Sequence, residues 1–237
     1  MKVTTLMRKA LPLKTCGAVI VAAGNASRMG GIDKVMAELQ GEPMIARTVR
    51  TFQNCDCISE IVIVTREDLI LPITNLTRDM HKVKAVVRGG SSRQESVNLG
   101  LNALSKEVQL AAIHDGARPL ISMEVIDRTV RAAHTHSAAA PAIPVKDTIK
   151  VVEGRVVVNT PDRATLFAVQ TPQVFDFDLL RGALAKAEAE GAQVTDDCSA
   201  VELMGMKVKI VDGDERNLKV TTPMDLRIAE MLLEEMK

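Results

Sequence analysis

Aromatic side chains are scarce in this chain of 237 residues, which has no tryptophan, no tyrosine and four phenylalanines. Proteins that hold single-stranded nucleic acid stack the bases on aromatic rings, so this composition argues against a nucleic-acid partner. Lysine plus arginine and aspartate plus glutamate each number 30, so no overall field draws the protein to a polyanion or a membrane. Any anion-binding site must therefore come from a local cluster of cations.

Cysteine is also rare, and no apolar run approaches the length of a membrane span. The cysteines show neither a CxxC pair nor a zinc-type spacing, which favours ordinary thiols in a reducing compartment. They are Cys16, Cys55, Cys57 and Cys198. Residues 1–15 have no clean hydrophobic core of a signal peptide and are interpreted as a short N-terminal tail. We therefore expect a cytoplasmic protein with no membrane partner.

Short apolar runs alternate along the chain with helical patterns. The runs are continuous, which is typical of strands covered by helices on both faces. This order predicts one α/β domain over 1–237, with a mostly parallel, Rossmann-like sheet flanked by helices. The expected strands are 16–23, 60–65, 84–88, 108–115, 138–145, 166–172 and 206–211, and the expected helices are 43–53, 92–104, 122–136, 178–190 and one starting at Pro223.

The segment 146–160 breaks this alternation with two valine-rich runs on either side of Glu153-Gly154. Such a pattern predicts a β-hairpin. An isolated hairpin is barely stable in water, and this one has no sheet to join. We therefore expect a protruding arm that needs a partner surface, such as a second copy of the chain.

The first expected strand runs into a loop of small residues, AAGNASRMG, followed by Lys34. The loop matches neither GxxxxGK[ST] nor GxGxxG. Its exposed N–H groups, small side chains and two cations, Arg28 and Lys34, nevertheless suit a triphosphate. A plain strand-to-loop connection with solvated charges is the alternative.

Three further segments carry candidate binding chemistry. In RGGSSRQES (88–96), a Gly-Gly turn opens a helix and either admits a ligand ring or serves as a simple cap. Asp115 ends an apolar strand and either helps to hold Mg²⁺ or pairs with Arg118. Lys219 precedes a Thr-Thr-Pro helix start and either faces the same crevice or lies in solvent. His114 is interpreted as a partly buried, hydrogen-bonded side chain.

Read in order, the segments resemble the 2-C-methyl-D-erythritol 4-phosphate cytidylyltransferase family over about residues 16–233. The motifs are AAGNASRMGGIDK, RGGSSRQESV, HDGARP, PVKDTIK, TPDR, QTPQ, TDDCSA and NLKVTTP. The resemblance implies a nucleotide-diphospho-sugar transferase type of fold and a Mg²⁺-dependent reaction of CTP with a methylerythritol phosphate. It also implies a homodimer whose 146–160 arms exchange between subunits.

The resemblance assigns residues by position. Arg28, Lys34 and Lys219 correspond to the catalytic cations. The CTP-binding positions are Ala22, Ala23, Gly24, Gly89, Gly90, Arg93, Ser96 and Asp115, of which Asp115 faces the metal. The sugar-phosphate positions are Arg118, Thr148, Arg163, Thr171 and Thr195, with Thr148 and Arg163 supplied by the partner subunit.

The chain departs from the family pattern in the first loop, which commonly reads GxGxRM followed by PKQ. Ala26 replaces the second glycine, Asp33 the proline and Val35 the glutamine. Arg216 stands where some members carry an acidic residue. Two alternatives remain open: a ribitol 5-phosphate cytidylyltransferase and a catalytically silent CTP-binding protein.

Overall fold

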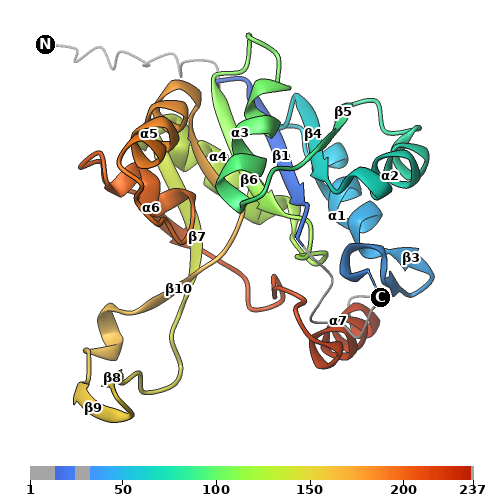
Figure 1. Cartoon of the computed structure of the whole chain (residues 1–237). Coiled ribbons are helices and arrows are strands. Elements are labelled where there is room, and N and C mark those ends of the chain that lie inside the picture. The colour runs from blue at the N-terminus through green and yellow to red at the C-terminus, as the bar shows by residue number, and fades with distance from the viewer. Residues whose placement is uncertain (1–13, 25–32, 236–237) are drawn as a thin grey trace, which may run out of the picture.

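A computed structural model describes residues 14–24 and 33–235, and its centre is an eight-stranded mixed sheet (Figure 1). The strand order is β10-β7-β11-β6-β1-β4-β5, and β12 also pairs with β7. The strands are β1 (Cys16–Ala22), β4 (Glu60–Thr65), β5 (Val83–Arg88), β6 (Leu110–Asp115), β7 (Ala138–Pro144), β10 (Phe167–Val169), β11 (Gln173–Asp176) and β12 (Lys209–Asp212). The mostly parallel α/β architecture predicted from the sequence is confirmed.

The parallel strands β1, β4, β5 and β6 end at the same edge of the sheet. β1 lies between β4 and β6, so that Ala22 is opposite Thr65 and Val21 is opposite Asp115. β4 in turn pairs with β5 and sets Thr65 opposite Arg88. In open α/β sheets this carboxyl edge is where ligands bind.

Helices cover both faces of the sheet, as its continuous apolar strands require. The helices are α1 (Met44–Asn54), α2 (Ile70–Thr77), α3 (Arg93–Asn102), α4 (Met123–His136), α5 (Phe177–Ala189), α6 (Asp197–Glu202) and α7 (Pro223–Glu235). Ile20 packs with α1 and α4, whereas its neighbour Val19 packs with α3, α5 and α6. The two cores are thus built from alternate residues of one strand.

Several elements were not expected from the sequence. The two-residue strands β2 (Glu38–Leu39) and β3 (Glu42–Pro43) form a second, antiparallel sheet. α2 contains Pro72, but this proline lies in the first helical turn, where its missing N–H costs no hydrogen bond. β11 is a separate strand, antiparallel to β6 and β7, that follows β10 where a single run over 166–172 was predicted. α6 is only six residues long, too short for a visible periodicity.

The predicted hairpin is present as a two-stranded ribbon that extends from the body (Figure 1). β8 (Val151–Glu153) pairs with β9 (Val156–Asn159), and the turn residues Gly154 and Arg155 both have positive φ, at 52° and 68°. All seven strand residues are exposed, valines included. The ribbon pairs with neither of the other two sheets of the described chain.

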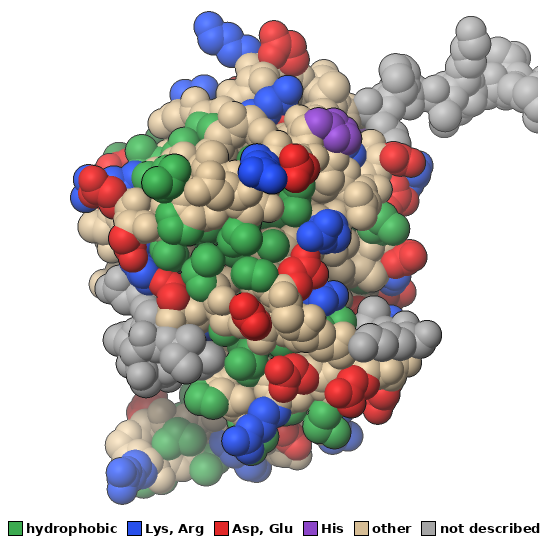
Figure 2. Space-filling view, turned by 90° about the vertical axis from the view of Figure 1, so that its right-hand side faces the viewer, with side chains coloured by type: hydrophobic (Ala, Val, Ile, Leu, Met, Phe, Trp, Pro, Cys, Tyr) green, Lys and Arg blue, Asp and Glu red, His purple; other side chains and the backbone are tan. Residues whose placement is uncertain are grey.

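The surface carries charges of both signs, interspersed on the face that Figure 2 shows. This agrees with the equal numbers of basic and acidic residues in the chain. Within 14–24 and 33–235, no helix is long and apolar enough to cross a membrane. All four cysteines are free thiols, as expected, and Cys55 Sγ lies 3.2 Å from Cys57 Sγ. Most of the predicted N-terminal tail, residues 1–13, lies outside the described residues.

Candidate active site

A cavity of about 460 Å³ opens at the carboxyl edge of β1 and β6. Five segments form its wall: the end of β1, the start of the short helix at Lys34–Met36, the first turn of α3 with the residues before it, the end of β6 with Ala117, and the loop before α7. The lining residues are Val21, Ala22, Ala23, Gly24, Lys34, Val35, Gly90, Ser91, Ser92, Arg93, Ser96, Asp115, Ala117 and Lys219.

The Gly89-Gly90 turn is packed too tightly for side chains. A Cβ on Gly89 would lie 2.4 Å from Ala23 Cβ, and one on Gly90 would lie 2.2 Å from a side-chain carbon of Glu95. Ser96 Oγ accepts a hydrogen bond from Gly90 N (3.1 Å) and donates one to Ser92 O (2.8 Å). Ser96 therefore holds the turn against α3 as well as lining the cavity, and the glycines bring main chain to its wall.

Asp115 is the centre of the charge arrangement. Its Oδ2 lies 2.9 Å from Lys219 Nζ and 3.6 Å from Arg118 Nε, and its Oδ1 lies 3.7 Å from Arg93 Nε. Burial alone raises the pKa of this carboxyl, but the three cations outweigh burial and lower the pKa to about 2. Asp115 is therefore an anion at every physiological pH.

Two buried residues, Thr171 and His114, support Asp115 through hydrogen bonds. Thr171 Oγ1 accepts a hydrogen bond from Asp115 N (3.1 Å) and lies 3.0 Å from His114 Nδ1. His114 Nε2 faces the carbonyl Arg118 O (3.4 Å), which can only accept, so in the neutral ring Nδ1 accepts from the Thr171 hydroxyl. Burial lowers the pKa of His114 to about 3, so the ring is neutral. The hydrogen bonding predicted for His114 is confirmed, but the side chain is completely buried where partial burial was predicted, and it is not poised to act as a base.

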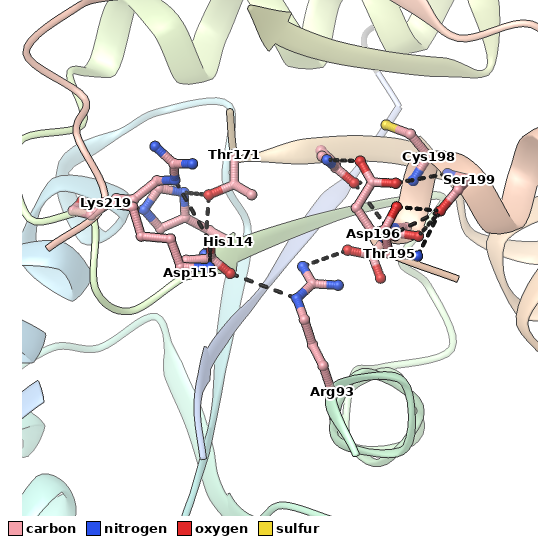
Figure 3. Close-up of polar contacts among 12 residues, drawn as sticks. Arg93, His114, Asp115, Thr171, Thr195, Asp196, Cys198, Ser199 and Lys219 are labelled. Atoms are coloured by element: carbon pink, nitrogen blue, oxygen red, sulfur yellow. Dashed lines mark hydrogen bonds and ion pairs between the residues drawn. The ribbon is translucent and has the colours of Figure 1, made fainter. Parts of the chain in front are cut away.

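Arg93 projects from the first turn of α3 between Asp115 and the turn at residues 195–199 (Figure 3). Its Nη2 donates to Asp197 Oδ2 at 2.7 Å, and Asp197 is only 1% exposed. Burial opposes the charge on Arg93, yet the carboxylates of Asp197 and Asp115 raise its pKa above the ordinary value. Gln173 fixes this turn in place: its Oε1 accepts from the N–H groups of Asp197 and Cys198.

Lys219 reaches the cavity because the loop that carries it is tied across the end of β6. Arg118 Nη1 donates to Asn217 O (2.7 Å), and Val220 N donates to Ala117 O (2.9 Å). The fully buried amide of Asn217 also donates to Thr171 O (2.9 Å). The loop therefore runs directly beside Asp115, which places Lys219 against it.

The structure brings most of the predicted site residues together. Lys34 and Lys219 line one cavity, with Ala22, Ala23, Gly24, Gly90, Arg93, Ser96 and Asp115, and Gly89 lies directly behind its wall. Arg118 and Thr171 stand behind Asp115 instead of on the wall, and Thr195 lies in the turn beyond Arg93 (Figure 3). Thr148 and Arg163 belong to the arm region, where Arg163 Nη1 donates to Lys146 O (2.9 Å). Arg28 lies outside the described residues.

Among its described lining residues, the cavity offers one carboxylate to a divalent metal, that of Asp115. Within 14–24 and 33–235, no group of three or more His, Cys, Asp or Glu side chains converges on a metal position. Mg²⁺, however, characteristically takes one or two carboxylates and completes its shell with substrate phosphates and water. Asp115, ionised and on the cavity wall, fits that role as a single carboxylate ligand.

Comparison with known proteins decides the family. Residues 16–235 match the family model described as 2-C-methyl-D-erythritol 4-phosphate cytidylyltransferase. The chain belongs to this family. Curated cytidylyltransferases from Symbiobacterium thermophilum and Caldanaerobacter subterraneus are 46% and 44% identical to it, covering 92% and 91% of this chain and 92% and 97% of their own.

Solved structures of the cytidylyltransferase family share the fold. The 4-diphosphocytidyl-2C-methyl-D-erythritol synthase from Anaerococcus prevotii superimposes with a TM-score of 0.85 at 32% identity, over 93% of this chain and 96% of that one. The cytidylyltransferase from Thermus thermophilus gives 0.78 at 31% identity, over 93% and 99%. The whole body of the chain, not one motif, therefore has the architecture of the cytidylyltransferase family.

The sequence indicated the residues that line the cavity, but not the residues that position them. Asp197, the buried partner of Arg93, lies beside the predicted Thr195, but nothing in TDDCSA distinguishes it from Asp196. Asn217 opens the motif NLKVTTP two residues before Lys219, but the motif does not indicate that its side chain holds the loop. Such positioning residues depend on contacts across about a hundred residues of chain, which no local pattern records.

Proposed function

We propose that this chain transfers a cytidylyl group from CTP to 2-C-methyl-D-erythritol 4-phosphate, in the isoprenoid pathway of its family. The products are 4-diphosphocytidyl-2-C-methyl-D-erythritol and pyrophosphate. The observation that carries the proposal is that Lys34 lines the same cavity, at the carboxyl edge of the sheet, in which Arg93 and Lys219 flank Asp115.

In the reaction, an oxygen of the methylerythritol phosphate forms a bond to the α-phosphorus of CTP. The bond between that phosphorus and the bridging oxygen breaks, and pyrophosphate leaves with the electron pair. The nucleophile is already an anion, so no general base is needed, consistent with a neutral, enclosed His114. The main obstacle is repulsion between two polyanions, which positioning and charge neutralisation overcome.

Each group of residues has its own role in binding the substrates and neutralising their charge. Lys34 and Arg28 bind the triphosphate and stabilise the charge that develops on pyrophosphate. Lys219, already in contact with Asp115, balances charge near the α-phosphate. Arg93 and the Gly89-Gly90 turn hold the cytidine side, with Ser96 and the backbone of residues 22–24. Asp115 would hold Mg²⁺, which when bound neutralises phosphate oxygens.

The sugar phosphate is assigned to the residues behind Asp115 and beyond Arg93. Arg118 and Thr171 lie behind Asp115, and Thr195 lies beyond Arg93. Thr148 and Arg163 complete this subsite from the arm of a second subunit. Two observations support that assignment: the ribbon pairs with neither of the other described sheets, and Val156, its most exposed valine, is 67% exposed. A homodimer with exchanged arms would bury this apolar surface.

The test is pyrophosphate release from CTP with either 2-C-methyl-D-erythritol 4-phosphate or ribitol 5-phosphate, with and without Mg²⁺. We expect turnover only with the methylerythritol phosphate and Mg²⁺. Turnover with ribitol 5-phosphate alone would reassign the acceptor, and CTP binding without pyrophosphate release would indicate a silent binding protein. The free thiols support a cytoplasmic setting for this reaction.

The arm can be tested separately. Val157→Lys places a charge on the exposed ribbon, and sedimentation should show a shift from dimer to monomer together with a higher KM for the sugar phosphate. Lys84→Glu, on the edge strand β5 of the body, is the matched control. A dimer unaffected by Val157→Lys would exclude the arm from the interface.

A further inference from the structure

Asp33, which stands directly before Lys34, uses both of its carboxylate oxygens. Oδ1 accepts a hydrogen bond from Val35 N at 3.2 Å and so caps the short helix Lys34–Met36. Oδ2 accepts one from Arg66 Nη2. The residue directly before Lys34 is thus joined by an ion pair to Arg66, in a different part of the chain.

Arg66 follows the last residue of β4 and lies at the same edge of the sheet as the cavity. Its neighbour Thr65 is opposite Ala22 in the ladder, and Thr65 Oγ1 donates to Ala22 O at 3.5 Å. Ala22 and Asp33 are therefore both tied to the residue pair Thr65 and Arg66.

The Asp33–Arg66 contact is the sheltered half of a larger cluster. Arg66 also donates to Asp68, at 3.1 Å from Nε and 2.9 Å from Nη2. The Asp68 side chain is 64% exposed, whereas those of Arg66 and Asp33 are 25% and 21% exposed. Water and salt screen the pair with Asp68 more strongly, so the pair with Asp33 is the one that fixes geometry.

The two contacts of Asp33 bear on its backbone conformation. Its φ is −65° and its ψ is 111°, and a φ near −65° is the value that a proline ring imposes. Aspartate adopts this φ without a ring, and in the folded chain the cap to Val35 and the ion pair to Arg66 hold it there.

We propose that Asp33 and Arg66 are a positioning pair that sets the direction in which Lys34 enters the cavity. Neither residue lines the cavity, so neither touches the nucleotide, and both act through Lys34. Lysine has a flexible stem, so the position of its backbone decides where the ammonium group can reach. The inference rests on the proposed function, specifically on contact between Lys34 and the triphosphate.

The experiment compares Asp33→Asn, Arg66→Gln and the double variant with the parent, measuring kcat, KM for both substrates and the unfolding midpoint. Asp33→Asn keeps the cap acceptor and removes only the charge. We expect kcat/KM for CTP to fall about tenfold in each single variant, because a small misplacement of a catalytic group is costly. KM for the sugar phosphate should stay within about twofold, since the pair acts on Lys34 alone.

In the double variant, kcat/KM for CTP should be no lower than in the less active single variant, because both substitutions remove the same interaction. Asp68→Asn removes the other partner of Arg66 and should retain parental kinetics. Asp33→Pro in the Arg66→Gln background should recover activity, because the ring replaces the ion pair as the restraint on φ.

Two results would overturn the inference: single variants with parental kcat/KM for CTP, or a double variant whose losses add. Losses that affect both substrates equally and follow a lower unfolding midpoint would reduce the pair to a stabilising contact. Lys34→Ala, measured alongside, distinguishes failure of the proposed function from failure of the positioning pair. Full activity in Lys34→Ala would remove Lys34 from the proposed function, whereas a strong loss there with none in Arg66→Gln would refute the positioning pair alone.

Discussion

Replacement of Lys219 by methionine separates catalysis from stability at this site. The change keeps much of the side-chain length and removes the ammonium group that lies 2.9 Å from Asp115 Oδ2. We expect kcat to fall about 100- to 1000-fold, the range seen when one donor to a developing oxyanion is removed. The fold should survive, because Arg118 and Arg93 remain within 4 Å of the same carboxylate.

The effect on stability can be bounded from the pKa of Asp115. Burial raises this pKa and the three cations lower it, for a net fall from 3.8 to about 2. At 1.36 kcal/mol per pKa unit, the ionised Asp115 stabilises the fold by about 2.5 kcal/mol at neutral pH, which is the net of the three cations and the cost of burial. Lys219 is one of the three cations, and its side chain is 43% exposed, so screening by solvent reduces its share.

The pH dependence has a definite sign. The folded pKa of Asp115 lies below its unfolded value, so its contribution is complete above pH 3.8 and is lost as the pH falls toward 2. In Lys219→Met the folded pKa rises toward the unfolded value, so the pH-dependent loss should be smaller and should be complete at a higher pH. Urea unfolding between pH 2 and 7, with pyrophosphate release at neutral pH, measures both effects, and Lys207→Met at an exposed position is the control. Wild-type kcat, or a stability loss above about 3 kcal/mol at pH 7, would refute this reasoning.

Three further outcomes are expected. Gly100→Ala should destabilise the fold by about 1–3 kcal/mol, because its Cβ would lie 2.3 Å from a core valine, whereas Gly182→Ala, with space around it, should be neutral or stabilising in thermal unfolding. Asp197→Asn should weaken CTP binding in calorimetry about tenfold by releasing Arg93, and unchanged affinity would exclude that link. Chelation by EDTA should abolish turnover and Mg²⁺ should restore it, whereas Asp115→Asn should not recover at any Mg²⁺ concentration.

The fold could be predicted because its signals are local. Continuous apolar strands such as 60–65 and capped helices such as the one after Ser122 identify themselves within a few residues. The parallel order then places the ends of β1 and β6 at one edge, which is why Asp115 and the loop after Ala22 could be expected together. The resemblance to the family supplied Lys219, whose position no periodicity indicates.

The residues that fix the site could not be predicted, because each acts over a long separation. Arg66 reaches Asp33 across 33 residues, and Arg93 reaches Asp197 across 104. Asp33 itself was visible only as a departure from the family's proline. The structure gives that departure a physical reason, since Asp33 has the φ of a proline and an ion pair to maintain it.

The charge arrangement also explains how a chain with no net charge can bind two polyanions. Lys219 and Arg93 do not stand alone in the cavity: Asp115 and Asp197 hold them at fixed positions by ion pairs. These carboxylates reduce the repulsion between neighbouring cations and orient them before substrate arrives, so little reorganisation is needed in the transition state. Phosphate oxygens then share cations that are already in place. Because the carboxylates hold the cations as well as balance them, neutralising Asp115 or Asp197 should weaken phosphate binding, although it removes negative charge from the site.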